Sequence, residues 1–400
     1  MSNLNLSEIR QLWWLLPLIL SLLGCFLSLW IVVPAPTWSL LPFGVCAPEI
    51  SPWLVVINGI ALILLPWIPK SWISNLILIC SLLGLILSVL PLVQFPSTNK
   101  QFAGEMERVL GTDYLKNIPQ VIERMRSKPL AIADVFRGIF LVDVRIERSI
   151  VFASPDGVDL KLNTYKPIAT GKYPTLIILY GGAWREGSPS SYEQFSCYFA
   201  AQGYTVIAID YRHAPKYKFP TQLEDVETAL QYIRDRAENL EVDTSKMAIM
   251  GRSAGGHLAS LAAYKQDAIP FKAVINYYGP VDLASGYYDL PTPDPIDIQT
   301  VLKNFLGGTP EEQAKLYHQA SPISYMRPDL PPSLLIYAGR DHLVQAKFGR
   351  QLYDKLRVNN PAVYLEIPWA EHAFDAVFFG VSNQLALYYT ERFLASTINN

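Results

Sequence analysis

Apolar positions dominate the first hundred residues, and charged ones are almost absent there. No Asp, Glu, Lys or Arg occurs in three runs, at residues 11–33, 51–69 and 71–99. Because a helix rises 1.5 Å per residue, about 20 apolar residues are enough to cross the hydrocarbon of a bilayer. The runs predict a transmembrane region over 1–99, with helices at about 11–33, 51–69 and 71–95. A signal peptide or a buried core helix is disfavoured, since the first run is long and two more follow it.

Tryptophans and the few nearby charges bear on how this region would sit in a membrane. Seven of the nine tryptophans lie at or near the ends of the runs, where an indole favours the headgroup region: Trp13, Trp14, Trp30, Trp38, Trp53, Trp67 and Trp72. Arg10 and Lys70 place the N-terminus inside and the C-terminal part on the extracytoplasmic side. Lys100 and Arg108, just beyond the third run, favour the opposite orientation. We expect a multi-pass integral membrane protein.

Between residues 100 and 142 the chain becomes polar, with apolar positions at helical spacing. These positions are Met106, Val109, Leu110, Leu115, Ile118, Val121, Ile122 and Met125. The pattern predicts an amphipathic helical connector that packs on the next domain. An interfacial membrane helix or a lid over a site is the alternative.

From residue 143 to 400, strand-like apolar runs alternate with amphipathic helical stretches. The runs are 146–152, 158–165, 175–180, 205–210, 247–250, 273–278, 333–337 and 363–367. Helices are expected near 192–202, 222–239, 254–264, 346–357 and 382–397. This alternation predicts an α/β domain with about eight strands, mostly parallel, and helices on both faces. One interval, about 281–330, has a proline-rich stretch and a helical stretch but no strand, and we expect it to cap a site.

Charge and cysteine content exclude several classes of function. The net charge is −2 and there is no long basic run, so nucleic acid is not an expected partner. Of the four cysteines, only Cys197 lies in the soluble part, so neither a disulfide framework nor a cysteine metal cluster is expected there. We predict no metal and no cofactor.

A serine between glycines follows the strand-like run that ends at Met250, in the sequence IMGRSAGGHLA at 249–259. Gly251 and Gly255 permit a sharp turn from strand to helix. Ala254 opens that helix and directs its N–H at charge developing near the serine. Ser253 is therefore the candidate nucleophile; the alternative is a small residue in a glycine-rich loop.

A serine nucleophile needs a histidine base that is oriented by a carboxylate. Among the five histidines, His372 lies in a loop just past the last predicted strand, and Asp341 follows the strand before it. Because ligands gather at the carboxyl ends of parallel strands, Ser253, Asp341 and His372 are expected to meet. The alternative is that Asp341 caps a helix that begins near Val344 and that His372 is an ordinary loop residue.

A second glycine-containing segment, YGGAW at 180–184, follows another predicted strand. Glycines at a strand end let backbone N–H groups face a substrate oxyanion, although a plain tight turn has the same composition. Beside the candidate triad, this segment is interpreted as an oxyanion-hole loop.

Together these segments resemble the α/β-hydrolase superfamily, in its branch of hormone-sensitive-lipase-like and feruloyl-esterase-like carboxylesterases. The matching segments are YGGAW, DYRHAP at 210–215, FPTQLEDV at 219–226, GRSAGG at 251–256, SPISY at 321–325, YAGRDHLV at 337–344 and EHAFD at 371–375, and the likeness covers about residues 145–400. The resemblance implies the α/β-hydrolase fold, with Gly182, Ala183 and Ala254 as oxyanion donors. One departure is Tyr180, because the family usually has His there; the tyrosine hydroxyl is the candidate substitute.

We therefore expect a membrane-anchored serine hydrolase that cleaves carboxylic esters, lipid-like ones among them, through an acyl-enzyme. Tyr180, Trp184 and Arg252 are candidate substrate contacts, with a salt bridge as the alternative role of Arg252. The alternative functions are an enzyme that resembles prenylcysteine methylesterases and a non-catalytic binding protein on a hydrolase scaffold. A transporter is disfavoured, because the membrane runs lack buried charges.

Overall fold

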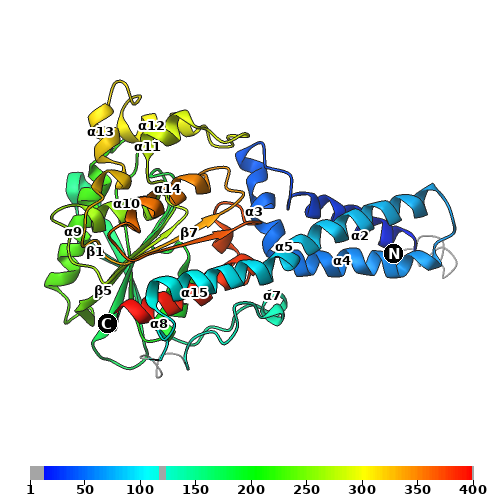
Figure 1. The fold of residues 1–400 in the computed structure, drawn as a ribbon, viewed down its shortest axis with the longest axis horizontal. Helices are drawn as coiled ribbons and strands as arrows, with labels where there is room; N and C mark the ends of the chain where they lie inside the picture. Colours follow the sequence, from blue (N-terminus) through cyan, green and yellow to red (C-terminus); the bar gives the residue numbers. More distant parts are fainter. Residues whose placement is uncertain (1–12, 117–122, 399–400) are drawn as a thin grey trace, which may run out of the picture.

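The computed structural model describes residues 13–116 and 123–398. An α/β part surrounds a twisted sheet, and a bundle of N-terminal helices projects away from it (Figure 1). The bundle consists of α2 (Leu15–Leu29), α4 (Ser51–Leu64) and α5 (Trp72–Leu110), and α5 returns from the far end of the bundle into the α/β part.

Eight strands form the sheet in the order β1-β2-β4-β3-β5-β6-β7-β8. Their bounds are β1 Arg145–Ala153, β2 Leu160–Lys166, β3 Tyr173–Leu179, β4 Thr205–Ile209, β5 Val242–Arg252, β6 Ala273–Tyr277, β7 Ser333–Ala338 and β8 Ala362–Ile367. β2 pairs antiparallel with β1 and with β4, and the other five pairs are parallel. The predicted eight-stranded, mostly parallel sheet is confirmed.

Helices cover both faces of this sheet (Figure 1). α9 (Thr221–Asp235), α10 (Ala254–Tyr264) and α14 (Ala346–Leu356) lie on one face, and α8 (Glu193–Ala201) and α15 (Val381–Ile398) lie on the other. Apolar side chains of the strands and these helices form one continuous core. The parallel register brings the carboxyl ends of β5, β7 and β8 to one edge, where the loops that carry the candidate site begin.

Two of the N-terminal helices, α2 with 15 residues and α4 with 14, are shorter than the uncharged runs at 11–33 and 51–69. Among the described helices, only α5, with 39 residues, is long and apolar enough to cross a membrane, whereas α2 has 15 residues. Trp38–Glu49 and Ser51–Trp67 make a second candidate only if they count as one span, and they are bent by 81°. Three spanning helices and a multi-pass arrangement are therefore not supported. Residues 11 and 12 of the first predicted helix, and Arg10, lie outside the described residues.

Prolines account for part of this difference, because absence of charge does not determine where a helix ends. Pro52 stands in the first turn of α4, where its missing N–H costs nothing, and Pro66 lies in the 3-10 turn Leu65–Trp67 that follows α4. The apolar character of the runs is nevertheless visible at the surface. Large apolar side chains remain exposed along the bundle, including Phe26 on α2, Ile63 on α4, and Ile79 and Ile86 on α5.

The predicted boundary at residue 99 falls inside α5, which continues as one helix to Leu110. Its last turns belong to the α/β part: Phe102 and Met106 join the main core, and the Phe102 ring packs on Tyr389 with centroids 5.4 Å apart. The remaining connector contains the short helix α7 (Ile132–Arg137). The predicted apolar positions Ile118, Val121 and Ile122 lie outside the described residues.

The strandless interval at 281–330 folds into short helices. These are α11 (Leu283–Tyr288), α12 (Ile298–Leu306), α13 (Ala314–Gln319) and the 3-10 turn Pro322–Tyr325. α12 coincides with the predicted helical stretch, and the Asp297 carboxylate caps it by accepting a hydrogen bond from the backbone N–H of Thr300 at 3.2 Å.

Candidate active site

Ser253 lies on the sharp turn between β5 and α10. Its backbone has φ 50° and ψ −124°, a strained conformation for a residue with a side chain. Glycine is required on both sides of it: a Cβ on Gly251 would lie 2.0 Å from the carbonyl oxygen of Gly255, and one on Gly255 would lie 2.3 Å from that of Leu179. The backbone N–H of Ser253 donates to the carbonyl of Tyr277 on β6 at 2.9 Å. The turn thus holds the serine side chain at the carboxyl edge of the sheet.

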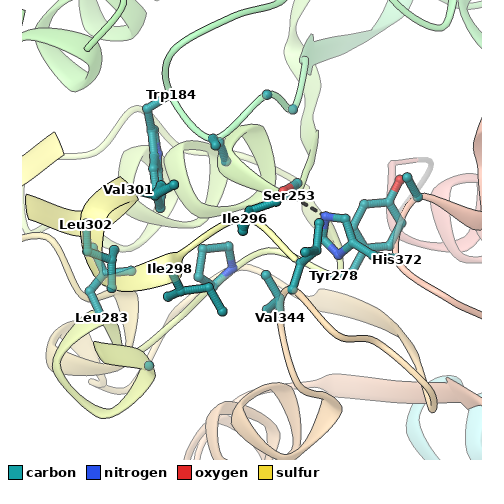
Figure 2. Close-up of a pocket in the computed structure, with 18 of the residues that line it drawn as sticks. Trp184, Ser253, Tyr278, Leu283, Ile296, Ile298, Val301, Leu302, Val344 and His372 are labelled. Carbon is teal, nitrogen blue, oxygen red and sulfur yellow. Dashed lines mark hydrogen bonds between the residues drawn. The ribbon is translucent and has the colours of Figure 1, made fainter. Parts of the chain in front are cut away.

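Ser253, His372 and Asp341 are brought together at this edge. The distance from Ser253 Oγ to His372 Nε2 is 2.9 Å, and the distance from His372 Nδ1 to Asp341 Oδ2 is 2.7 Å. Figure 2 shows the His372 ring directed at Ser253. With Nδ1–H donating to the carboxylate, Nε2 is left to accept the serine proton. The side chains come from the loops after β5, β7 and β8, in the order that the sequence predicted.

Asp341 is buried and is fixed by more than its contact with His372. Its Oδ1 atom accepts hydrogen bonds from the backbone N–H groups of Leu343 at 2.8 Å and Val344 at 2.6 Å. Burial raises the pKa of Asp341, and the neighbouring His372 opposes that rise. One carboxylate oxygen of Asp341 thus holds the loop before α14 and the other faces His372, whereas the N-cap of α14 is Gln345 and no side chain caps that helix.

Glu371 is a residue of the site that the sequence analysis missed. Its Oε1 atom accepts hydrogen bonds from the backbone N–H groups of His342 at 2.8 Å and His372 at 2.9 Å. Its Oε2 atom lies 2.6 Å from Nδ1 of His342, and this hydrogen bond raises the pKa of His342. Glu371 thus joins the loop that carries Asp341 to the loop that carries His372. The sequence did hold a signal for this pair, because Glu371 directly precedes the candidate base His372 and His342 directly follows the candidate acid Asp341.

The loop after β3 carries the other predicted residues of the site. Gly181 lies against the nucleophile turn, because a Cβ there would be 3.1 Å from the Cβ of Ser253. Gly182, with φ 132°, and Ala183, with φ 51°, follow in conformations that turn the backbone back on itself. Gly182, Ala183 and Ala254 line the same pocket as Ser253. No side chain or loop carbonyl among the described residues accepts a hydrogen bond from their N–H groups.

Tyr180, a predicted substrate contact, is buried beneath this loop and is not among the described residues that line the pocket. Its hydroxyl donates to Asp210 Oδ1 at 2.5 Å and lies 2.9 Å from Nε2 of His213, and its ring stacks on Tyr211 with centroids 4.5 Å apart. A Cβ on Gly187 would lie 2.3 Å from the Tyr180 ring, so the returning loop packs directly on the tyrosine. Burial holds the pKa of Tyr180 well above its usual value. Tyr180 supports the loop from below as a neutral donor.

Trp184, a second predicted contact, does line the pocket. Its ring stacks on Phe305 of α12 with centroids 4.1 Å apart, and its indole Nε1 donates to Nδ1 of His257 at 3.1 Å. Because Nδ1 accepts, the proton of His257 is on Nε2, which donates to the carbonyl of Ala320 at 2.6 Å. Burial lowers the pKa of His257 to about 4. His257 is therefore a neutral support for Trp184.

Arg252, the third predicted contact, is buried behind the pocket and does not line it. Its guanidinium pairs with Asp375 and lies 4.1 Å from the ring centroid of Phe195. The hydroxyl of Tyr278 donates to the other oxygen of Asp375, and the Tyr278 ring lies 4.6 Å from the His372 ring. The salt-bridge role considered for Arg252 is the one that the structure supports. Asp375 and Tyr278, which the sequence analysis did not single out, complete a polar network behind the histidine.

A pocket of about 330 Å³ opens beside Ser253 and His372 (Figure 2). Its lining is mainly apolar, and the 281–330 interval contributes much of it: Leu283, Ile296, Ile298, Val301 and Leu302. Val344 and Leu343 follow from the loop after Asp341, and Trp38 comes from the N-terminal region. A small polar centre with a largely apolar wall is typical of a site for a small organic ligand.

Comparison with known proteins associates this arrangement with esterases. The family model BD-FAE matches residues 162–356, a stretch that contains Ser253 and Asp341. The chain is 31% identical over 227 residues to esterase LipC of Mycobacterium tuberculosis, covering 52% of this chain and 55% of that protein. It is 30% identical over 224 residues to the probable carboxylic ester hydrolase LipM of the same organism, covering 52% and 50%. The chain thus spans about half the length of these curated relatives.

Solved structures agree at the level of the fold. A hyperthermophilic esterase from the archaeon Pyrobaculum calidifontis aligns with a TM-score of 0.57 and 23% identity over 71% of this chain and 91% of that one. A bacterial heroin esterase aligns with a TM-score of 0.57 and 24% identity over 64% and 85%. The chain is thus similar in sequence to esterases over about half of its length, and it shares the fold of these two solved structures.

Proposed function

We propose that the chain is a serine hydrolase that cleaves carboxylic esters through an acyl-enzyme. The observation that carries this proposal is the continuous contact from Ser253 through His372 to Asp341, with steps of 2.9 and 2.7 Å. At such distances a base can take the proton of a nucleophile and an acid can orient the base. The esterase relatives add support.

In the proposed reaction, Ser253 Oγ attacks the ester carbonyl carbon while His372 Nε2 takes the hydroxyl proton. The contact with Asp341 keeps the other proton of His372 on Nδ1 and stabilises the imidazolium. His372 then gives its proton to the departing alcohol oxygen as the carbon–oxygen bond breaks, which leaves the acyl group on Ser253. A water molecule, deprotonated by the same histidine, releases the acid and restores the serine.

The oxyanion that forms at each attack needs donors, and we assign them to the backbone N–H groups of Gly182, Ala183 and Ala254. All three residues line the pocket beside Ser253, and Ala254 begins α10, so the positive end of that helix dipole faces the same point. Loss of one such donor typically costs about 3 kcal/mol of transition-state stabilisation.

We also propose that the N-terminal bundle anchors the enzyme in a membrane. α5 supplies a helix of sufficient length, and the exposed apolar side chains on α2, α4 and α5 form a surface that soluble monomers rarely leave uncovered. Retention of the full-length protein in the membrane pellet after alkaline carbonate extraction is the expected result. Release into the supernatant would contradict the anchoring.

The hydrolase proposal is tested on full-length protein in detergent with p-nitrophenyl esters from acetate to palmitate. We expect hydrolysis by the wild type, and a loss of about a thousandfold or more in Ser253→Ala, because the nucleophile is removed. Ser245→Ala, at an exposed position near the start of β5, is the matched control. A folded wild type that hydrolyses none of the esters and does not react with a fluorophosphonate would favour the binding-protein alternative.

A further inference from the structure

Trp38 brings the N-terminal region into the pocket. It is the one described residue of the first hundred that lines the pocket, and its side chain is 52% exposed. It begins the 3-10 turn Trp38–Leu40, which leads into α3 (Leu41–Glu49). The pocket is therefore composite, with walls from the α/β part and from the region proposed to lie at the membrane.

The segment that carries Trp38 is fixed to the α/β part on both sides. Before it, the carbonyl oxygen of Val32 accepts a hydrogen bond from the guanidinium of Arg340. After it, the buried carboxylate of Glu49 accepts one from the backbone N–H of Ser382 at 2.8 Å, at the start of α15. These contacts give Trp38 a defined position beside the pocket.

Leu343 makes the apolar surface continuous between the pocket and the N-terminal region. It lines the pocket, and it also packs on the cluster of Ala35, Leu41 and Val45. Apolar contacts thus lead from the pocket over Leu343 to this buried cluster, and Trp38 and Phe43 expose apolar side chains on the same segment. A hydrocarbon chain that lies against these side chains has less of its surface in water.

Aromatic side chains indicate the depth of the pocket mouth relative to a bilayer. Trp30, the residue after α2, stacks on Phe43 of α3 with ring centroids 5.6 Å apart, and α3 contacts α15 of the α/β part. Trp67 and Trp72 lie at the opposite end of the bundle, on either side of the turn between α4 and α5. Because tryptophan concentrates at the headgroup level, the proposed anchoring puts the Trp30–Phe43 pair at the membrane surface next to the α/β part. The pocket mouth, with Trp38, then lies at the headgroup level on the side of the α/β part.

We infer that the substrate is a carboxylic ester whose long acyl chain lies in the bilayer, and that Trp38 is a specificity-determining residue against which this chain packs. The inference rests on the proposed hydrolase function and on the proposed membrane anchoring. A pocket of about 330 Å³ is at the small end of the range for ligand sites, so it holds the reacting ester and part of the chain. The remainder of the chain follows the apolar surface past Trp38.

The test compares a bilayer-resident ester with a water-soluble one in the same vesicles. Full-length protein is reconstituted in ether-linked phosphatidylcholine, which offers no competing carboxylic ester, and kcat/KM is measured for p-nitrophenyl palmitate and p-nitrophenyl butyrate. Titration with a small fluorophosphonate counts the intact sites, so every rate refers to folded protein. The variants are Trp38→Ala, Trp38→Phe and, as the matched control, Trp67→Ala, which removes an indole of 64% exposure from the other end of the bundle.

We expect Trp38→Ala to lower the palmitate-to-butyrate ratio of kcat/KM about tenfold per intact site, Trp38→Phe to retain most of the ratio, and Trp67→Ala to keep the wild-type ratio. A wild-type ratio in Trp38→Ala, or an equal ratio in Trp38→Ala and Trp67→Ala, overturns the inference and leaves the hydrolase function in place. If the wild type hydrolyses neither ester and takes up no phosphonate, the hydrolase function itself fails, and the inference fails with it.

Discussion

Glu371 and His342 are paired across the two loops that carry the proposed catalytic acid and base, with 2.6 Å between the carboxylate and Nδ1 of His342. The same carboxylate accepts hydrogen bonds from backbone N–H groups of both loops. Since Glu371 does not line the pocket, it acts on the reaction through the positions of Asp341 and His372. It is a positioning residue, and its removal changes the geometry of the site without removing a reacting group.

Replacement of Glu371 by Ala is therefore expected to lower kcat by about ten- to a hundredfold with little change in KM, because a small displacement of a base is that costly. Glu371→Gln keeps one oxygen acceptor and is expected to recover part of the loss. Kinetics on p-nitrophenyl butyrate measure both parameters. The control is Glu227→Ala on α9, which removes an exposed carboxylate that pairs with Lys265. Equal kcat in Glu371→Ala and wild type would refute the positioning role.

His257 predicts a dependence of stability on pH. It is buried and neutral in the folded protein, where its pKa is lowered to about 4 from the 6.5 of the unfolded chain. The unfolded state therefore binds a proton first, so the stabilisation present above pH 6.5 is lost progressively as the pH falls toward 4. The difference between the two pKa values of His257 corresponds to roughly 3 kcal/mol of unfolding free energy.

Urea unfolding of the detergent-solubilised protein between pH 7.5 and 4.5 measures this term. In His257→Gln the dependence on pH should be flatter than in the wild type, although the variant is less stable at pH 7.5 because Trp184 loses its acceptor. His318→Gln, at an exposed position on α13, serves for comparison. Parallel pH curves for wild type and His257→Gln would show that another group is responsible.

The hydroxyl of Tyr180 is expected to affect both stability and activity. In Tyr180→Phe the carboxylate of Asp210 loses a donor at 2.5 Å in a largely buried place, which should lower the unfolding free energy by about 1–3 kcal/mol. Because the ring supports the loop that carries Gly182 and Ala183, kcat should fall as well. Thermal unfolding and ester kinetics provide the two readouts. Tyr173→Phe, which removes an exposed hydroxyl contact to Ala169, should change neither, and an equal response of the two variants would contradict the assignment.

Arg252 and Asp375 form an ion pair in which both side chains are 1% exposed. Arg252→Met alone should cost about 3–5 kcal/mol of stability, because it leaves the Asp375 carboxylate buried without its counter-ion. The double variant Arg252→Met/Asp375→Asn should cost clearly less than the sum of the two single variants. Unfolding free energies of the four proteins give the coupling. If the losses of unfolding free energy in the two single variants add up to the loss in the double variant, the two charges do not stabilise each other.

The strands and the Ser253, Asp341, His372 set could be predicted because their signals are local. Each strand is a short apolar run, and each of the three residues follows directly after such a run. The parallel register then brings them to one edge of the sheet without further information. The turn at Ser253 is equally local, since its two close approaches require glycine at 251 and 255.

The remaining features depend on contacts between distant parts of the chain. Trp38 lines a pocket whose nucleophile is at position 253, and Arg340 binds the carbonyl of Val32. No spacing rule relates such positions. The sequence shows Glu371 only as an acidic residue in a loop, because its partners come from another loop. The sequence also does not show whether Tyr180 lines the pocket, because its burial depends on how the loop after it folds. The lengths of the N-terminal helices also escaped prediction, because a run of uncharged residues does not specify where prolines and packing end a helix.

The continuity of α5 has a consequence for how the proposed enzyme meets its substrate. With 39 residues it extends for about 58 Å as one helix, from the far end of the bundle into the core of the α/β part. With α5 seated in a bilayer, the site is held at a constant height above the hydrocarbon. Encounters then depend on lateral diffusion in two dimensions, and the rate follows the amount of ester per unit area of membrane. Dilution of the same ester in more lipid would slow the enzyme, whereas dilution of the vesicles in more buffer would not.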